Sequence, residues 1–288
     1  MRQGTSMTLT EETTLSESER TAEGSTPLWA GLPDVSLRYT DSGGGGRPLL
    51  LLHEMGGSLE SWNPVLAEMA LDRRVLRCDA RGSGGSEKIR STVTVDVLVE
   101  DIIALLDNLK IKDPVDVAGV ALGGCIGLVL ASRYPDRVHR LAAINPPTNA
   151  SGRSGEILRA RADTADKLGM RGIVDAALAR SYPENLREPE DDYNAYVARF
   201  LTNDPTSYAH IVRALSVSDL GETLPNIVTK TLFVSGKYDL VRPPADIAVI
   251  SQQVPGAQHR VIEGGHIPSV QAPSALAATL SEFFGGHE

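Results

Sequence analysis

The pattern of apolar and polar positions predicts short buried strands that alternate with helices over most of the chain. Strands are predicted at residues 35–39, 49–52, 74–78, 117–120, 140–144, 231–234 and 259–262. Helices are predicted at residues 64–70, 95–109, 125–131, 245–254 and 274–284. Because short apolar strands that alternate with helices need cover on both faces, this order predicts an α/β fold with a mostly parallel central sheet.

Turn and cap residues mark where some of these elements begin and end. Apolar residues recur at helical spacing over 95–109, with Thr94 as the predicted N-cap, and Pro114 follows the helix. Asp41 and Ser42, followed by glycines 43–46, predict a loose hairpin after the strand at 35–39.

The alternation of strands and helices stops after Asn145-Pro146-Pro147. Residues 151–219 contain three or four amphipathic helices and no convincing strand. A helical insertion between strands of a sheet is most simply a lid over a site. We therefore expect a flexible tail at 1–27, a core formed by 28–150 and 220–288, and a helical cap at 151–219.

Composition restricts the partners and the compartment. The 288 residues are 41% hydrophobic and carry a net charge of -9, which argues against nucleic acid or an anionic membrane as a partner. The polar first residues lack the apolar segment of a secretory signal. Cys78 and Cys125 fall in predicted buried elements far apart in the sequence, which favours free thiols in a reducing cytoplasm.

The segment 117–124 predicts a strand, a tight turn and a buried helix. Gly119 and Gly123 lack a Cβ, so the strand and the helix can approach closely around the residue between them. This arrangement is typical of a nucleophile elbow, in which a strained backbone directs one side chain at the active site. Ser, Cys or Asp is expected at that position, but the residue is Ala121.

Two polar side chains that follow later strands are candidates for a catalytic pair. Asp239 comes after the strand at 231–234, and His266 comes after the strand at 259–262. Either one alone is more simply a structural loop residue. The order elbow, Asp, His is nevertheless the chain order of a hydrolase triad, with each member at a strand end.

The loop from His53 to Ser58 is the fourth part of this pattern. Backbone N–H groups at Glu54 or Met55, together with that of Leu122, are predicted to hold a developing oxyanion. His53 and Gly56 of the same region are candidate substrate contacts. The Glu54 side chain is either a second acid or base or, more simply, a carboxylate that faces solvent.

These motifs resemble the α/β-hydrolase superfamily over about residues 35–284, and within it the 3-oxoadipate enol-lactonases and related C–C bond hydrolases. The matching segments are 53–58, 79–86, 119–124, 133–138, 236–243 and 265–268. The resemblance implies that Asp239 is the acid, His266 the base and Ala121 the nucleophile position. The chain departs from the family at Ala121 and at Glu54, where members usually carry Ser and Gly.

Three hypotheses can explain Ala121. The alanine is an engineered replacement of a serine, or it is natural and His266 acts directly on water or substrate, or the protein is a binding relative without catalysis. Under the second hypothesis the reaction could also be a proton transfer, a decarboxylation, an isomerisation or a C–C cleavage. Cys125 lies one helical turn beyond the turn and is more simply a core residue than a nucleophile.

The substrate is predicted to be a small molecule that can carry a carboxylate. Four basic residues are candidates to hold it: Arg159, Arg161, Arg180 and Arg242. No metal-binding cluster and no complete phosphate- or dinucleotide-binding loop is found in the sequence, so no cofactor is implied.

Overall fold

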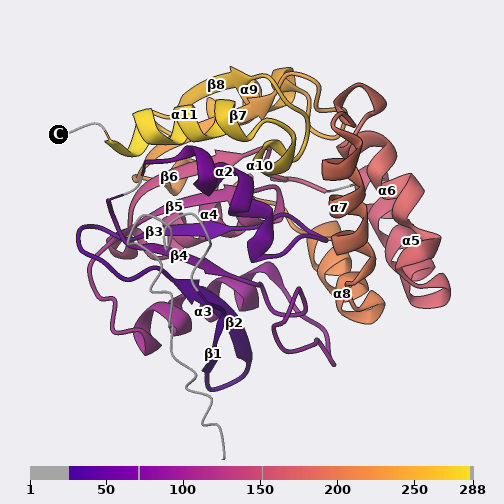
Figure 1. Cartoon of the computed structure of the whole chain (residues 1–288), viewed down its shortest axis with the longest axis horizontal. Helices are drawn as coiled ribbons and strands as arrows, with labels where there is room; N and C mark the ends of the chain where they lie inside the picture. Colours follow the sequence, from indigo (N-terminus) through magenta and orange to yellow (C-terminus); the bar gives the residue numbers. More distant parts are fainter. Residues whose placement is uncertain (1–25, 71, 151, 286–288) are drawn as a thin grey trace, which may run out of the picture.

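The computed structural model describes residues 26–70, 72–150 and 152–285, so residues 1–25 of the predicted tail lie outside the described residues. In this part of the chain, eight strands form one sheet in the order β1-β2-β4-β3-β5-β6-β7-β8 (Figure 1). The strands are β1 Leu28–Gly31, β2 Ser36–Asp41, β3 Leu49–Leu52, β4 Val75–Cys78, β5 Val115–Val120, β6 Val138–Ile144, β7 Lys230–Gly236 and β8 Gln258–Ile262. All pairings from β4 to β8 are parallel, which confirms the predicted fold class.

The first two strands correct one local expectation. Strand β2 pairs antiparallel with β1 on one side and with β4 on the other. Strand β4 therefore lies between β2 and β3, so glycines 43–46 connect two strands that are not neighbours, and the predicted hairpin there is wrong. The hairpin lies one connection earlier, between β1 and β2. The pattern missed β1 because its four residues are mostly exposed.

Helices cover both faces of the sheet, because successive residues of the buried strands point to opposite sides. Leu50 and Leu52 of β3 pack in one apolar cluster with helices α3, α4 and α9. Leu49 and Leu51 pack in the other cluster with α2 and α11. The bounds are α2 Asn63–Glu68, α3 Val95–Asn108, α4 Leu122–Arg133, α9 Pro244–Ser251, α10 Pro268–Gln271 and α11 Pro273–Gly285. The Thr94 side chain caps α3 by accepting from the Val97 N–H at 3.3 Å.

Four helices lie between β6 and β7 and gather beyond one end of the sheet (Figure 1). They are α5 Arg153–Leu168, α6 Val174–Ser181, α7 Glu190–Leu201 and α8 Pro205–Ser216. Backbone hydrogen bonds join the two chain segments at their base, from Ala150 N–H to Ser218 C=O (3.1 Å) and from Leu220 N–H to Thr148 C=O (2.7 Å). We refer to α5–α8 as the helical insertion.

Among the described helices, none combines the length and the apolar character that crossing a membrane requires.

Candidate active site

The turn between β5 and α4 has the strained geometry expected from the sequence. Ala121 has φ 46° and ψ -108°, a backbone conformation that residues with a Cβ rarely adopt. A Cβ on Gly119 would lie 2.2 Å from the Gly123 carbonyl oxygen, and one on Gly123 would lie 2.3 Å from the Leu52 carbonyl oxygen. Both neighbours are backbone atoms, so only glycine fits at either position. The turn therefore presents the side chain of Ala121 at the end of the buried strand.

His266 and Asp239 form the hydrogen bond expected between them. Asp239 is 2% exposed, and its Oδ2 lies 2.8 Å from His266 Nδ1. The other oxygen, Oδ1, accepts from the backbone N–H groups of Val241 (2.6 Å) and Arg242 (2.8 Å). A carboxylate held by donors in this way favours the His266 tautomer with its proton on Nδ1. Nε2 is then the ring atom that can accept a proton.

His266 and Ala121 line the same cavity, which has a volume of about 130 Å³. The sheet and its loops contribute Met55 and Leu122 to the wall as well. The helical insertion contributes mainly apolar and aromatic side chains, among them Leu158, Leu178, Tyr196 and Phe200. A concave, largely apolar site with a few polar groups is the usual form of a small-molecule site.

The residues with the three candidate oxyanion donors, Glu54, Met55 and Leu122, all line this cavity. Leu122 is the first residue of α4, so its N–H belongs to the helix start, where backbone N–H groups have no partner within the helix. The dipole of α4 also favours negative charge at this end. The Gly123 N–H donates to the His53 carbonyl (3.1 Å) and so ties the turn to the loop that carries Met55.

His53 and Gly56 support the loop and do not line the cavity. His53 is buried, with Nδ1 2.6 Å from the Glu54 carbonyl oxygen and Nε2 accepting from the Ala80 N–H at 3.0 Å. Both ring nitrogens are therefore occupied by the protein. Gly56 has φ +83°, and a Cβ there would lie 2.6 Å from the Phe200 ring. Neither residue lines the cavity, so their contact with a substrate stays a prediction.

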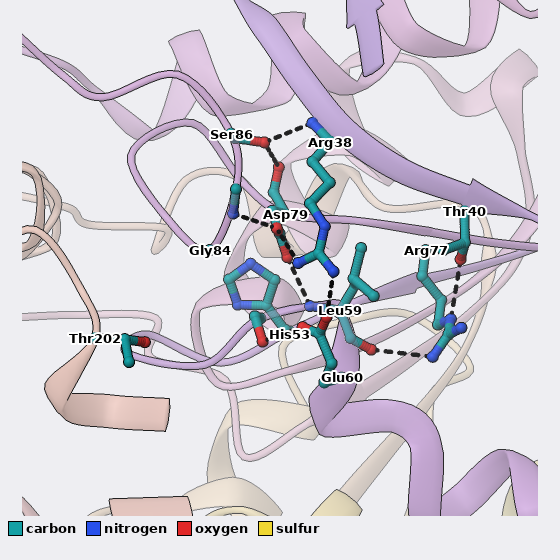
Figure 2. A network of polar contacts seen from close by, with 12 residues as sticks. Arg38, Thr40, His53, Leu59, Glu60, Arg77, Asp79, Gly84, Ser86 and Thr202 are labelled. Atoms are coloured by element: carbon teal, nitrogen blue, oxygen red, sulfur yellow. Dashed lines mark hydrogen bonds and ion pairs between the residues drawn. The ribbon is translucent and has the colours of Figure 1, made fainter. Parts of the chain in front are cut away.

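Residues 79–86 form hydrogen bonds that hold the loop after β3 in place, and Figure 2 shows several of them. Asp79 Oδ1 accepts from the Leu59 N–H (2.7 Å), and Oδ2 accepts from the Gly85 N–H (2.7 Å) and from Arg38 (3.1 Å). The Ser86 hydroxyl donates to the Asp79 carbonyl at 2.7 Å. These bonds hold the loop after β4 beside the loop after β3. The Ala80 N–H of the former donates to His53 Nε2 of the latter.

Glu54 does not face solvent, and the simpler expectation for it is wrong. The residue is 1% exposed and lines the cavity. Oε1 accepts from the Ser61 hydroxyl at 2.8 Å, whereas Oε2 is buried and has no hydrogen-bond partner among the described residues. A Cβ on Gly57 would lie 2.1 Å from Oε1. The glycine therefore makes the room that lets the carboxylate turn inward.

The four candidate arginines differ in whether they line the cavity. Arg161, Arg180 and Arg242 line the cavity, whereas Arg159 is exposed on α5 and does not, so the cavity gives its assignment no support. Burial lowers the pKa of Arg242, with Asp246 and Asp239 opposing that shift. Its Nη2 donates to the Asn149 carbonyl at 3.1 Å, and its buried Nε has no partner in the described part of the chain.

Tyrosines of the helical insertion are site residues that the sequence pattern did not indicate. Tyr196 and Tyr208 are buried and line the cavity. Burial, together with the nearby Glu54 carboxylate, raises the pKa of Tyr196 well above its usual value. Burial also raises the pKa of Tyr208, although Arg161 opposes the shift. Both phenols are therefore neutral near pH 7, and their positions on amphipathic helices were the only signal available.

The two cysteines are free and buried. Burial raises the pKa of Cys125 to about 12 and also raises that of Cys78. Because the thiolate is the reactive form, neither cysteine has the character of a nucleophile. Within the described residues, no group of three or more His, Cys, Asp or Glu side chains is placed to hold a metal ion.

Comparisons with known proteins agree with this geometry. The profile of the protein family described as "alpha/beta hydrolase fold" matches residues 47–273. A 3-oxoadipate enol-lactonase of Acinetobacter baylyi is 28% identical over 84% of this chain and 91% of its own length. A candidate carbamate hydrolase of Pantoea ananatis, RutD, is 29% identical over 82% of this chain and 87% of its own length. The crystal structure of the enol-lactonase from Burkholderia xenovorans LB400 superposes with a TM-score of 0.85 at 29% identity, covering 90% of this chain and all of the other.

Proposed function

Because the chain belongs to the alpha/beta hydrolase fold family, we propose that it hydrolyses a small ester, lactone or related activated carbonyl compound by a mechanism that needs no serine. The observation that carries the proposal is the 2.8 Å hydrogen bond between His266 and Asp239 at the wall of the cavity that also contains Ala121. A base, its orienting acid and a helix start therefore surround one small space. Relatives named as enol-lactonases support the class of substrate.

In the proposed reaction a water molecule is the nucleophile. His266 Nε2 takes one proton of the water as its oxygen bonds to the carbonyl carbon. The electron pair of the C=O bond moves to oxygen, where the N–H groups of Met55 and Leu122 bind it. The intermediate then expels the leaving oxygen, which takes the proton back from His266. Asp239 keeps the ring oriented and stabilises the imidazolium that forms.

The size of these effects is sufficient for an activated substrate. A positioned general base contributes about 10²–10⁴ in rate, and an oxyanion donor about 10²–10³. An enol lactone releases a stabilised leaving group and needs less acceleration than an alkyl ester. The alanine at residue 121 is therefore compatible with catalysis, although it excludes the covalent acyl-enzyme of a serine hydrolase.

Arg242 and Arg161 are proposed to bind a carboxylate of the substrate. Both line the cavity, and the buried Arg242 Nε has no partner among the described residues. A carboxylate that accepts from a guanidinium forms a charge-assisted hydrogen bond and satisfies such a donor. Burial that lowers the pKa of Arg242 reflects a desolvated cation, which an anionic ligand would compensate.

We further propose that residues 151–219 act as a cap that screens the reaction from water, since Leu158 and Phe200 form part of the cavity wall. Two free, buried cysteines support a reducing cytoplasm as the place where the protein works.

The test compares the chain with its Ala121→Ser, His266→Ala and Asp239→Asn variants on a panel of simple esters and enol lactones. We expect steady turnover without a burst from the unaltered chain, with no mass added to the protein. The Ala121→Ser variant should give a burst and an acyl adduct visible by intact mass. His266→Ala should lose at least about 10²-fold in kcat, and Asp239→Asn a similar amount. Full activity in His266→Ala, or no hydrolysis of any compound by the unaltered chain, would contradict the proposal.

A further inference from the structure

The Glu54 carboxylate lies in a place where a charged group is costly. It is 1% exposed, and it lines the cavity together with Ala121 and His266. One oxygen is satisfied by the Ser61 hydroxyl at 2.8 Å. The other, Oε2, is buried and has no hydrogen-bond donor among the described residues. A buried acceptor without a donor is unfavourable, and more so when it is charged.

The surroundings hold one oxygen of this carboxylate in place. Ser61 is itself fixed, because its hydroxyl also accepts from Arg199 (3.5 Å) and from the Ser58 N–H (3.4 Å). Arg199 brings positive charge close to the Ser61 hydroxyl. The Tyr196 hydroxyl lies near this carboxylate but forms no hydrogen bond with Oε2, which leaves this oxygen able to accept from a molecule in the cavity.

Glu54 also immediately precedes Met55, a proposed oxyanion donor on the same wall. Leu122 and His266 line this cavity too, so a carbonyl group bound at Met55 and Leu122 would share the cavity with Glu54 and His266. A water molecule that attacks this carbon needs one base, and a second acceptor for its other hydrogen orients its lone pair toward the carbon.

We propose that Glu54 is a second catalytic residue, which accepts one hydrogen of the attacking water at Oε2 while His266 Nε2 accepts the other. This inference rests on the proposed hydrolysis. The proton that reaches His266 passes to the leaving oxygen when its bond to carbon breaks. The second hydrogen stays on the water oxygen, which becomes the hydroxyl of the product acid. That acid then loses its proton to Glu54 or to solvent, and all atoms and charges balance.

The experiment measures Glu54→Gln in two backgrounds. Glutamine keeps the size and can still accept from Ser61, but its NH₂ group donates where the carboxylate accepts. In the unaltered background we expect kcat to fall about 10²-fold while KM stays within about 3-fold. In the Ala121→Ser background the introduced hydroxyl attacks in the first step, so Glu54→Gln should change the burst rate by less than about 3-fold.

Two controls separate chemistry from folding. Glu68→Gln makes the same chemical change on an exposed residue of α2 and should leave kcat unaltered. Glu54→Gly, the residue usual in the family that the sequence resembles, removes the acceptor without adding a donor and should match Glu54→Gln. Thermal unfolding of each variant shows that it is folded.

The outcomes distinguish the two proposals. A loss of kcat in the unaltered background with an intact burst supports the role of Glu54. Equal losses of rate in both backgrounds would indicate a structural role for Glu54 and overturn its catalytic one. An unaltered kcat in Glu54→Gln, with His266→Ala inactive, would also overturn it. Undiminished turnover in His266→Ala overturns the proposed function instead, whatever Glu54→Gln does.

Discussion

Two buried polar atoms of opposite character lie on one cavity. Glu54 Oε2 is an acceptor and Arg242 Nε is a donor, and neither has a hydrogen-bond partner among the described residues. Both side chains line the space that contains His266. Buried polar groups without partners are uncommon and often mark functional positions. A ligand with a carboxylate for the arginine, attacked by water held at the glutamate, would satisfy both.

The first prediction concerns Arg242. Replacing it with Gln removes a charge-assisted hydrogen bond to the proposed substrate carboxylate, which is worth about 1.5–3 kcal/mol. We expect KM for an acidic substrate to rise about 10–100-fold, with less than about 3-fold change for the methyl ester of the same compound. Steady-state kinetics on the matched acid and ester measure both values.

Arg159→Gln is the matched control, because Arg159 is an exposed arginine of the helical insertion that does not line the cavity. It should leave KM for both substrates unaltered. An equal rise in KM for acid and ester in Arg242→Gln would show that Arg242 shapes the cavity rather than binding a carboxylate.

For single residues, the sequence predicted the backbone turn at Ala121 better than it predicted where the side chains of Glu54 and His53 point. The turn at Ala121 follows from Gly119 and Gly123, whose effect is local. The inward direction of Glu54 depends on space at Gly57 and on Ser61, and the burial of His53 depends on the Ala80 N–H from a separate loop. Those contacts are set by tertiary structure, so the sequence pattern could not indicate them.

At the scale of elements, the loops that follow β3 and β4 are joined by a network of polar contacts (Figure 2). Glu60, at the start of the turn before α2, forms an ion pair with Arg38 and accepts from the Ser58 hydroxyl. Arg38 in turn reaches Asp79 at 3.1 Å. This network holds the loop of Glu54 and Met55 against the sheet, so its stability should depend on pH.

The second prediction is a pH dependence of the free energy of unfolding. Burial alone would raise the pKa of Glu60, but the hydrogen bonds from Arg38 and Ser58 outweigh it and lower the pKa from 4.5 to about 2. A carboxyl whose pKa is lower in the folded state stabilises the fold above its unfolded pKa, and this contribution is lost as the pH falls from about 4.5 to 2. With solvent screening of a partly exposed pair, it amounts to about 1–2 kcal/mol.

Urea unfolding of the unaltered chain and Glu60→Gln at pH 7, 5 and 3 measures this effect. The variant should be less stable by about 1–2 kcal/mol at pH 7, and the difference should shrink by about half or more at pH 3. A difference that stays constant with pH would mean that the variant loses packing rather than an ionised carboxylate.

The strands were predictable where burial is local to the sequence, as in the fully buried β3 and β5. Pairing was not, because β2 contacts β4 across an intervening strand and helix. The glycines at 43–46 signalled a change of direction but could not indicate which strand would lie beside β2. Local turn chemistry thus predicts that the chain bends, whereas the sheet as a whole determines which strand it meets.

At the scale of the whole molecule, the cavity lies between the sheet and the helical insertion. The sheet side was foreseeable, since parallel strands place Ala121, Asp239 and His266 at one edge. The insertion was predicted as a lid that carries Arg161 and Arg180, but its apolar lining residues were not predicted. An amphipathic pattern shows that a helix has an apolar face and leaves open which partner covers it. Under the proposed function, these lining residues limit the size of the substrate.

The last prediction tests this control of size. Ala177 of α6 is 6% exposed and lines the cavity. Ala177→Leu adds three carbon atoms to the wall of a space of about 130 Å³, and leucine has nearly the helix propensity of alanine. We expect KM to rise about 10-fold or more for esters with longer acyl chains and to change less than about 3-fold for acetyl esters. The neighbouring Ala176 is exposed on the same helix, so Ala176→Leu should leave both values unaltered. Steady-state kinetics on a series of esters with increasing acyl-chain length measure KM for both variants. An equal rise in KM for short and long chains in Ala177→Leu would show that the change in α6 distorts the catalytic groups rather than limiting substrate length.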